Sequence, residues 1–265
     1  MKLSEKSPVR QYRCSLVIVV LANTLADKSR DLQKANRQKD EFIMNLSHVL
    51  KTPLTVILGW IDLLRSNESA KIDLNKSLTP MKKNGKALLK LIEDLLDTSR
   101  IVLGKVAMDR TDCDLLQIVA DCVESCQNAA ENKKLTLEFE SFLKFAPVKA
   151  DPARLTQIFL NLLSNSLKFT PDCGVINVNI SLNNKEFVVQ FIDTGIGISP
   201  EFLPSVFERM RQEEQSSKKK YGGLGLGLAI AHSLLEMHRG SIHAASAGPG
   251  KGATFTVRLP VRHNS

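Results

Sequence analysis

The succession of apolar and polar positions divides the chain into a helical first part and a mixed second part. From Asp27 to Glu41 the residues are mostly polar and favour helices, with neither glycine nor proline, which predicts a linker helix over 27–41. Apolar residues then recur at steps of three and four in two stretches, the pattern of two amphipathic helices. They are Ile43, Leu46, Leu50, Leu54, Ile57, Ile61 and Leu64 in the first stretch, and Leu74, Leu78, Met81, Gly85, Leu88, Ile92, Leu95, Ser99 and Val102 in the second.

A short polar break, Ser66-Asn67-Glu68-Ser69, separates these two helices, and Gly104 ends the second one. Two long helices joined by one short loop form a helical hairpin, here over 42–105. A single hairpin buries too little apolar surface, whereas two copies can close a four-helix bundle. The pattern therefore predicts a homodimer.

Beyond Gly104 the pattern becomes a mixture of helices and strands. Asp114 is a plausible N-cap for a helix to about Ala130, and Asp151-Pro152 opens another helix with proline in its first turn. Alternating or β-branched runs predict strands at 135–139, 175–180, 187–192, 241–247 and 253–259, and a helix is predicted over 223–238. We expect a mixed sheet covered on one face by helices.

The apolar run Cys14–Ala22 is the one ambiguous segment. It falls well short of the roughly 20 residues that cross a bilayer. Its β-branched centre suggests a strand or helix belonging to an upstream sensor domain, with residues 1–26 as the remnant, and a clipped membrane helix is the alternative. We therefore expect the chain to begin inside a longer protein, and any membrane contact to come only through that upstream segment.

Composition narrows the class of protein further. The net charge is +8, but the basic residues are scattered and only two tyrosines and one tryptophan accompany them, which favours a solvated surface over a nucleic-acid site. The five cysteines show no metal-binding spacing and form no disulfide framework. An odd cysteine count of this kind suits a reducing compartment, so a cytoplasmic location is expected.

Four motifs carry the candidate chemistry. Asn161–Thr170, Asp193–Ile198 and Gly222–Leu228 resemble, in this order, the N, G1 and G2 boxes of the gyrase, Hsp90, histidine-kinase and MutL ATPase superfamily. Upstream, Phe42–Leu54 resembles the phosphoacceptor box of sensor histidine kinases. Only that family combines both halves, and the resemblance covers about 30–262.

The resemblance implies a fold of class α + α/β. A dimeric helical-hairpin (four-helix bundle) domain over 42–105 would be followed by an α/β sandwich ATPase domain of the GHKL (Bergerat) type over 112–262. The implied activity is that of an ATP-dependent histidine kinase, with a response regulator receiver domain as the partner that takes the phosphoryl group on an aspartate.

His48 is the expected phosphoacceptor. It lies two positions from both Leu46 and Leu50, about 200° around a helix from each, so its imidazole should point to solvent. Pro53, five residues later, removes a helical hydrogen bond and can bend the helix there. By resemblance, Lys51 fits the usual basic position, and Thr52 fits the position that orients water when the partner is dephosphorylated.

The nucleotide motifs imply ATP with Mg²⁺. By resemblance, Asn165 gives an oxygen to Mg²⁺, Asn161 supports this site, Lys168 reaches a phosphate, and Asp193 reads adenine. Gly195 and Gly197 would let the backbone approach the base. The remaining expected contacts are to phosphates, from the helix N-terminus that follows the glycines and from one arginine. The residues expected to make these phosphate contacts are Gly223, Gly225, Gly227 and Arg211.

Two residues depart from the family pattern. Val49 follows the phosphoacceptor where an acidic residue normally acts as base and orienter, and a lost general base typically costs about 10²- to 10⁴-fold in rate. This leaves open an alternative, a pseudokinase or phosphatase-biased dimer that binds ATP. Leu224 replaces a residue that often carries a hydroxyl, with a modest expected effect because backbone donors should carry most of the phosphate binding.

Overall fold

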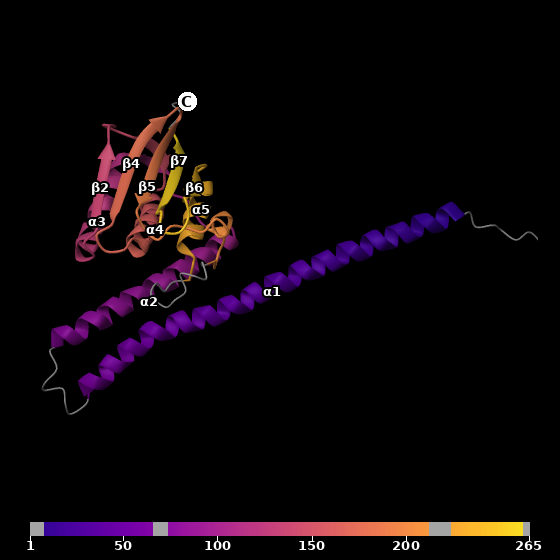
Figure 1. The fold of residues 1–265 in the computed structure, drawn as a ribbon, viewed down its shortest axis with the longest axis horizontal. Coiled ribbons are helices and arrows are strands. Elements are labelled where there is room, and N and C mark those ends of the chain that lie inside the picture. Colours follow the sequence, from indigo (N-terminus) through magenta and orange to yellow (C-terminus); the bar gives the residue numbers. More distant parts are fainter. Residues whose placement is uncertain (1–7, 66–73, 212–223, 262–265) are drawn as a thin grey trace, which may run out of the picture. The chain divides into compact units, whose positions relative to one another are not determined.

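The structure, a computed structural model, describes residues 8–65, 74–211 and 224–261 (Figure 1). The chain forms two units, one ending at Lys51 and one beginning at Thr52. The first unit contains most of the long helix α1 (Pro8–Arg65). The backbone of Cys14–Ala22 belongs to this helix, so the strand alternative for that segment is wrong. Among the described residues, no helix is both long and apolar enough to span a bilayer.

The second unit begins with the last part of α1 and continues into α2. α1 continues through Pro53, whose side chain is buried, and α2 spans Leu74–Val102 as the apolar pattern predicted. Gly104 follows α2 with a φ of +63°, a left-handed conformation that ends a helix at little cost for glycine. The predicted loop at 66–69 lies outside the described residues.

The mixed α/β part follows α2. Its elements are β1 (Thr111–Asp114), α3 (Leu115–Asn132), β2 (Thr136–Ser141), β3 (Pro147–Ala150), α4 (Pro152–Phe169), β4 (Val175–Asn183), β5 (Glu186–Asp193), the short 3₁₀ helix η2 (Leu203–Ser205), α5 (Gly227–Met237), β6 (Ser241–Ala245) and β7 (Ala253–Pro260). The main sheet has the order β2-β4-β5-β7-β6, in which only the β2–β4 pair is parallel. β1 and β3 form a separate antiparallel pair that the sequence pattern did not predict.

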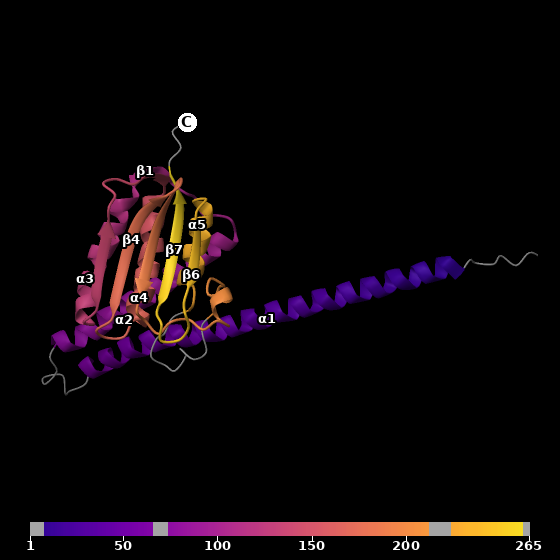
Figure 2. The ribbon, with the colours of Figure 1, turned by 45° about the horizontal axis from the view of Figure 1, so that its top comes forward.

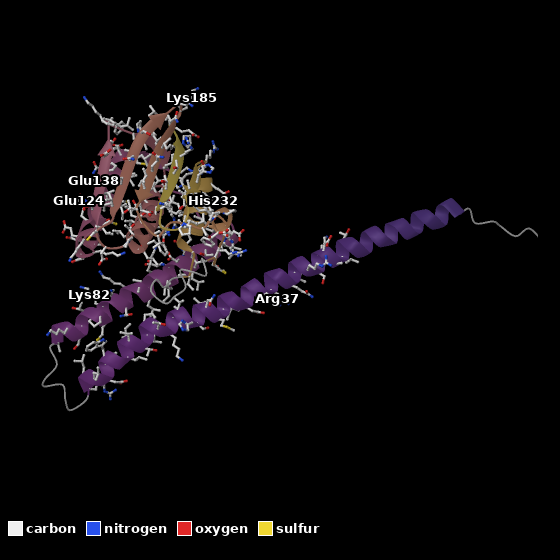
Figure 3. All side chains as sticks on the ribbon, in the orientation of Figure 1. Arg37, Lys82, Glu124, Glu138, Lys185 and His232 are labelled. Carbon is white, nitrogen blue, oxygen red and sulfur yellow. The ribbon has the colours of Figure 1, made fainter. Side chains whose placement is uncertain are left out.

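Helices α3, α4 and α5 lie together on one face of the main sheet, which confirms the expected layer arrangement (Figures 1 and 2). The core between these layers is apolar, and in it the rings of Phe159 on α4 and Phe191 on β5 stack with their centres 5.9 Å apart. Charged side chains such as Glu124 on α3 and Glu138 on β2 are exposed (Figure 3). This packing fixes the face of α4 that carries the N-box residues.

α5 begins later than the sequence pattern predicted. The predicted helix started at Gly223, which lies outside the described residues, but the observed helix starts at Gly227. Gly225 has a φ of +66°, outside the helical region, and the buried Leu226 is the N-cap residue. The glycine-rich segment is therefore a turn in front of the helix, and the prediction for 224–226 is wrong.

Asp151 ties three segments together at the start of α4. As predicted, it is the N-cap, and its Oδ1 accepts the Arg154 N–H at 3.1 Å. Its Oδ2 accepts the Asp109 N–H at 3.0 Å, and its own N–H donates to Nε2 of the buried His238 at 3.1 Å. Nδ1 of His238 lies 2.7 Å from Leu234 O, so the imidazole is neutral with its proton on Nδ1. α4 and α5 are thereby joined through one histidine.

We predict that this joint makes stability fall at mildly acidic pH. Burial lowers the pKa of His238, with the nearby Arg110 charge adding to the effect. Below about pH 6.5, the ordinary histidine pKa, the unfolded chain takes up a proton that the folded protein resists, so the free energy of unfolding decreases as pH falls. Urea unfolding at several pH values between about 5 and 7.5 measures this slope.

His238→Gln should flatten the slope, because this position then no longer titrates. His243→Gln is the matched control, since His243 is exposed on β6, and it should leave the slope as in the parent. A slope that is the same in the parent and in His238→Gln would contradict the assignment.

Candidate nucleotide and phosphoacceptor sites

Asp193, the last residue of β5, presents a buried and oriented carboxylate. Its Oδ1 accepts the backbone N–H groups of Gly195 at 2.9 Å and Ala253 at 3.2 Å, and its Oδ2 accepts the Ser166 hydroxyl at 3.4 Å. Burial raises the pKa of Asp193, and these three hydrogen bonds oppose that rise. Because Oδ1 is occupied by the protein, Oδ2 is the oxygen with capacity to accept a donor from a ligand.

The segment after Asp193 needs glycine for reasons within the protein. At Gly195 an added Cβ would lie 2.6 Å from Oδ1 of Asp193 and 2.8 Å from the Phe169 carbonyl oxygen. Gly197 has a φ of +71° and packs against the backbone of Gly248. The sequence explained both glycines by the approach of a ligand. The structure adds that the protein's own backbone requires them.

The N-box residues share one face of α4. Asn161 is buried, and its Nδ2 donates to the carbonyl of Gly227, the first residue of α5, at 3.2 Å. Asn165 lies one turn further on and is half-buried. The Lys168 ammonium lies 4.6 Å from the centre of the Phe169 ring, and burial lowers its pKa. Asn161 thus links the N box to the G2 helix, a contact the sequence did not reveal.

The G2 segment combines a close backbone contact with a helix N-terminus. An added Cβ at Gly225 would lie 2.6 Å from the carbonyl oxygen of Arg211, and the Met210 N–H donates to the Gly225 carbonyl at 3.2 Å. Leu224 is buried, which explains an apolar residue where a hydroxyl is common. Gly227 then opens α5, whose first N–H groups can bind an anion.

Arg211 is exposed and pairs with Glu208 of its own segment, Nε to Oε2 at 3.0 Å. The structure therefore gives it a partner other than a phosphate. Because both groups of this ion pair are exposed, it contributes little to the free energy of unfolding. Its role toward the nucleotide stays a prediction.

The phosphoacceptor motif lies on α1. His48, Lys51 and Thr52 are exposed and recur at helical spacing, so they share one face of the helix. The solvent-facing position predicted for His48 is confirmed. Val49 is half-buried, and an aliphatic side chain there can neither accept a proton nor orient an imidazole.

Two residues that build the site, Ser166 and Gly252, escaped sequence reasoning. Ser166, which bonds to Asp193, is 1% exposed, and a serine directly after Asn165 in the N box was the available signal. Gly252 has a φ of +69° and packs against the Asp193 backbone. Its partner is distant in sequence, so no local pattern could have indicated it.

Two family models match the chain. The His Kinase A (phospho-acceptor) domain matches residues 38–104, and the Histidine kinase-, DNA gyrase B-, and HSP90-like ATPase matches residues 150–263. Hybrid signal transduction histidine kinase D of Dictyostelium discoideum is 35% identical over 283 residues, covering 89% of this chain and 18% of that protein. Sensor histidine kinase YclK of Bacillus subtilis is 32% identical over 245 residues, covering 91% of this chain and 51% of that protein.

Solved structures agree on the fold. Histidine kinase ThkA, in a complex with response regulator protein TrrA, matches with a TM-score of 0.61 at 19% identity, covering 84% of this chain and 61% of that chain. This likeness shows the fold alone. The chain spans about half or less of the length of the two curated relatives described above.

The sheet, its three covering helices and the Asp193 site define an ATP-binding domain of the histidine-kinase, gyrase B and Hsp90-like class. With the phosphoacceptor domain that precedes it in the sequence, the chain belongs to the histidine kinases. Nothing in the fold or in these comparisons favours the pseudokinase alternative.

The residues present fit the expected ligands. Oδ2 of Asp193 can accept an N–H from adenine, and the N-terminus of α5 and Lys168 can meet phosphates. Within the described parts of the chain, no cluster of three or more histidine, cysteine or acidic residues could hold a metal ion. A single amide oxygen such as that of Asn165 suits Mg²⁺, which keeps several waters and binds largely through phosphates.

We predict that Asp193→Ala weakens ATP binding by at least about tenfold, because it removes a charge-assisted hydrogen bond inside a buried site. Asn165→Ala should weaken binding of ATP in the presence of Mg²⁺ by a similar factor. Asp172→Ala is the matched control, since Asp172 is an exposed aspartate on the turn after α4. Calorimetric titration measures all three, and unchanged affinity in both site variants would refute the pocket.

Proposed function

We propose that this chain is the core of a sensor histidine kinase that uses ATP and Mg²⁺ to phosphorylate His48 and passes the phosphoryl group to an aspartate of a response regulator. The observation that carries the proposal is an exposed histidine in the Ser-His-Val-Leu-Lys-Thr-Pro motif, within the region matching the phosphoacceptor family. We assign the phosphoacceptor and dimerisation domain to 42–105, the ATP-binding domain to 112–262, and a linker helix to 27–41.

In the proposed reaction, a ring nitrogen of neutral His48 attacks the γ-phosphorus of ATP. The N–P bond forms as the bond to the β-γ bridging oxygen breaks, ADP leaves, and the other ring nitrogen gives up its proton to solvent or phosphate. Phosphoryl transfer needs mainly positioning and charge neutralisation. In this chain Lys168, the α5 N-terminus and Mg²⁺ held with Asn165 would supply that neutralisation, and Asp193 would fix the adenine.

A response regulator fits as the partner on two grounds. The phosphoacceptor family match covers His48, and the matching ThkA structure was solved in complex with response regulator protein TrrA. We therefore infer that a receiver domain binds the hairpin near His48. Thr52 shares the exposed face of His48, where it would orient water for the reverse, dephosphorylating reaction.

Val49 gives the sharpest test of the chemistry. If the missing acid limits the rate, Val49→Glu should raise the rate of His48 phosphorylation by at least about tenfold, the low side of general-base effects. ATP affinity should stay the same, because residue 49 belongs to the phosphoacceptor helix and the proposed nucleotide residues belong to other elements. The initial rate of label transfer from γ-labelled ATP is the measurement, and acid lability of the label identifies phosphohistidine.

His48→Gln should abolish labelling in either background. Equal rates for the parent and Val49→Glu at saturating ATP would show that proton removal is not limiting, and Val49 would then be a neutral substitution. Label that persists in His48→Gln would overturn the phosphoacceptor assignment itself.

A homodimer is supported by the apolar surface of the hairpin. On α2, Leu78, Leu89, Ile92 and Leu96 are between 44% and 57% exposed, at helical spacing. An exposed apolar stripe of this kind is an association surface. Leu88 and Leu95 are half-buried instead, so they are not part of this stripe. We infer that the exposed stripe closes a four-helix bundle with a second copy.

Charges placed on this stripe should separate the copies. We predict that Ile92→Glu with Leu96→Glu yields a folded monomer, because two carboxylates would have to be buried in the bundle. Lys83→Glu is the control, since Lys83 is exposed on α2 and lies about 140° around the helix from Leu78, outside the stripe. Light scattering at micromolar concentration measures the mass, and a monomeric parent would exclude the dimer.

A further inference from the structure

Lys133 binds the end of the N-box helix from a different part of the fold. It follows α3 directly, and its half-buried side chain reaches across to the C-terminus of α4. Its ammonium donates to the carbonyl oxygens of Leu167 at 2.7 Å, Lys168 at 3.2 Å and Thr170 at 2.6 Å. A lysine ammonium has three donors, and here each has an acceptor.

The acceptors explain why a cation lies here. The last carbonyls of a helix lack intrahelical N–H partners and carry the negative end of the helix dipole. At this end of α4 the Thr170 N–H and its hydroxyl both bond to the Ser166 carbonyl, at 3.0 Å and 2.7 Å. Lys133 satisfies three further carbonyls, so a residue from outside α4 helps to fix its last turn.

This last turn also holds the proposed nucleotide residues. The Ser166 hydroxyl donates to Oδ2 of Asp193 at 3.4 Å, and the Phe169 carbonyl accepts the Ile196 N–H at 3.1 Å. Lys168 projects from the same turn over the Phe169 ring. A shift of the turn would therefore move the adenine-reading segment and the phosphate-binding lysine together.

We propose that Lys133 is a positioning residue for ATP: its three hydrogen bonds set the last turn of α4, and through it Lys168 and the Asp193–Ile196 segment. The inference rests on the proposed nucleotide pocket. Lys133 itself has its donors engaged by backbone carbonyls, so it acts through other residues and does not touch the ligand.

The chain offers a matched set of variants. Lys133→Met keeps the apolar stem and removes the donors, and Lys133→Arg restores a charged donor. Lys134→Met is the control, because Lys134 is the adjacent lysine and its side chain is exposed. At a temperature well below unfolding, Lys133→Met should weaken ATP binding about tenfold. This is the size of effect expected when a few charge-assisted hydrogen bonds that position the binding residues are lost. Lys133→Arg should recover most of that affinity, and Lys134→Met should bind as the parent does.

A second measurement separates positioning from plain stabilisation. If Lys133 acts through the last turn, its replacement should cost clearly less affinity in a Lys168→Met background than in the parent, because coupled residues are not additive. A lowered unfolding midpoint with unchanged ATP affinity, or strictly additive losses, would overturn the proposal. Should Lys133→Met fail to fold, Lys133→Gln, which retains a shorter donor, is judged by the same two criteria.

The outcome is distinguishable from failure of the pocket. If Asn165→Ala and Asp193→Ala weaken ATP binding while Lys133→Met does not, the pocket stands and the positioning role is refuted. If none of the three affects ATP binding, the pocket assignment fails and this inference fails with it.

Discussion

The nucleotide site depends on one helix being held at both ends. At its start, Asp151 caps α4 and binds His238 of the segment that ends α5. At its end, Lys133 binds three carbonyls of the last turn. Between these points α4 packs its apolar face on the sheet through Phe159 and Phe191. With rotation and translation restrained in this way, the positions of the N-box side chains relative to β5 are set before any ligand arrives, which reduces the ordering cost of binding.

The sheet and one glycine explain how a buried carboxylate is tolerated. Burial raises the pKa of Asp193, which disfavours its charged form. The backbone N–H groups of Gly195 and Ala253 compensate, but they can do so only because Gly195 has no side chain and β7 lies next to β5. The buried Asp193 carboxylate therefore requires both the glycine at position 195 and the placement of β7 next to β5.

The sequence predicted most elements because their signals are local. The apolar spacing gave α2 its bounds, and the N-caps Asp114 and Asp151 were found from residue type and context. The β1–β3 pair was missed because four-residue strands carry too little periodicity. The roles of Lys133 and His238 were missed for a related reason: their partners are mostly backbone atoms, many of them 34 or more residues away, which leave no mark in a motif.

Binding and phosphoryl transfer are separable in this chain because their residues occupy different elements. The residues that position the proposed nucleotide pocket lie between α3 and β7, whereas His48 and Val49 lie on α1. The departure at Val49 can therefore lower a rate without lowering occupancy of the ATP site. A kinase whose His48 is phosphorylated slowly but whose nucleotide site is intact would remain saturated with ATP. Its rate of phosphorylation would then depend on how often the bound ATP meets His48 in a productive geometry. In such a protein, control of the rate would act through α1, the helix that carries His48.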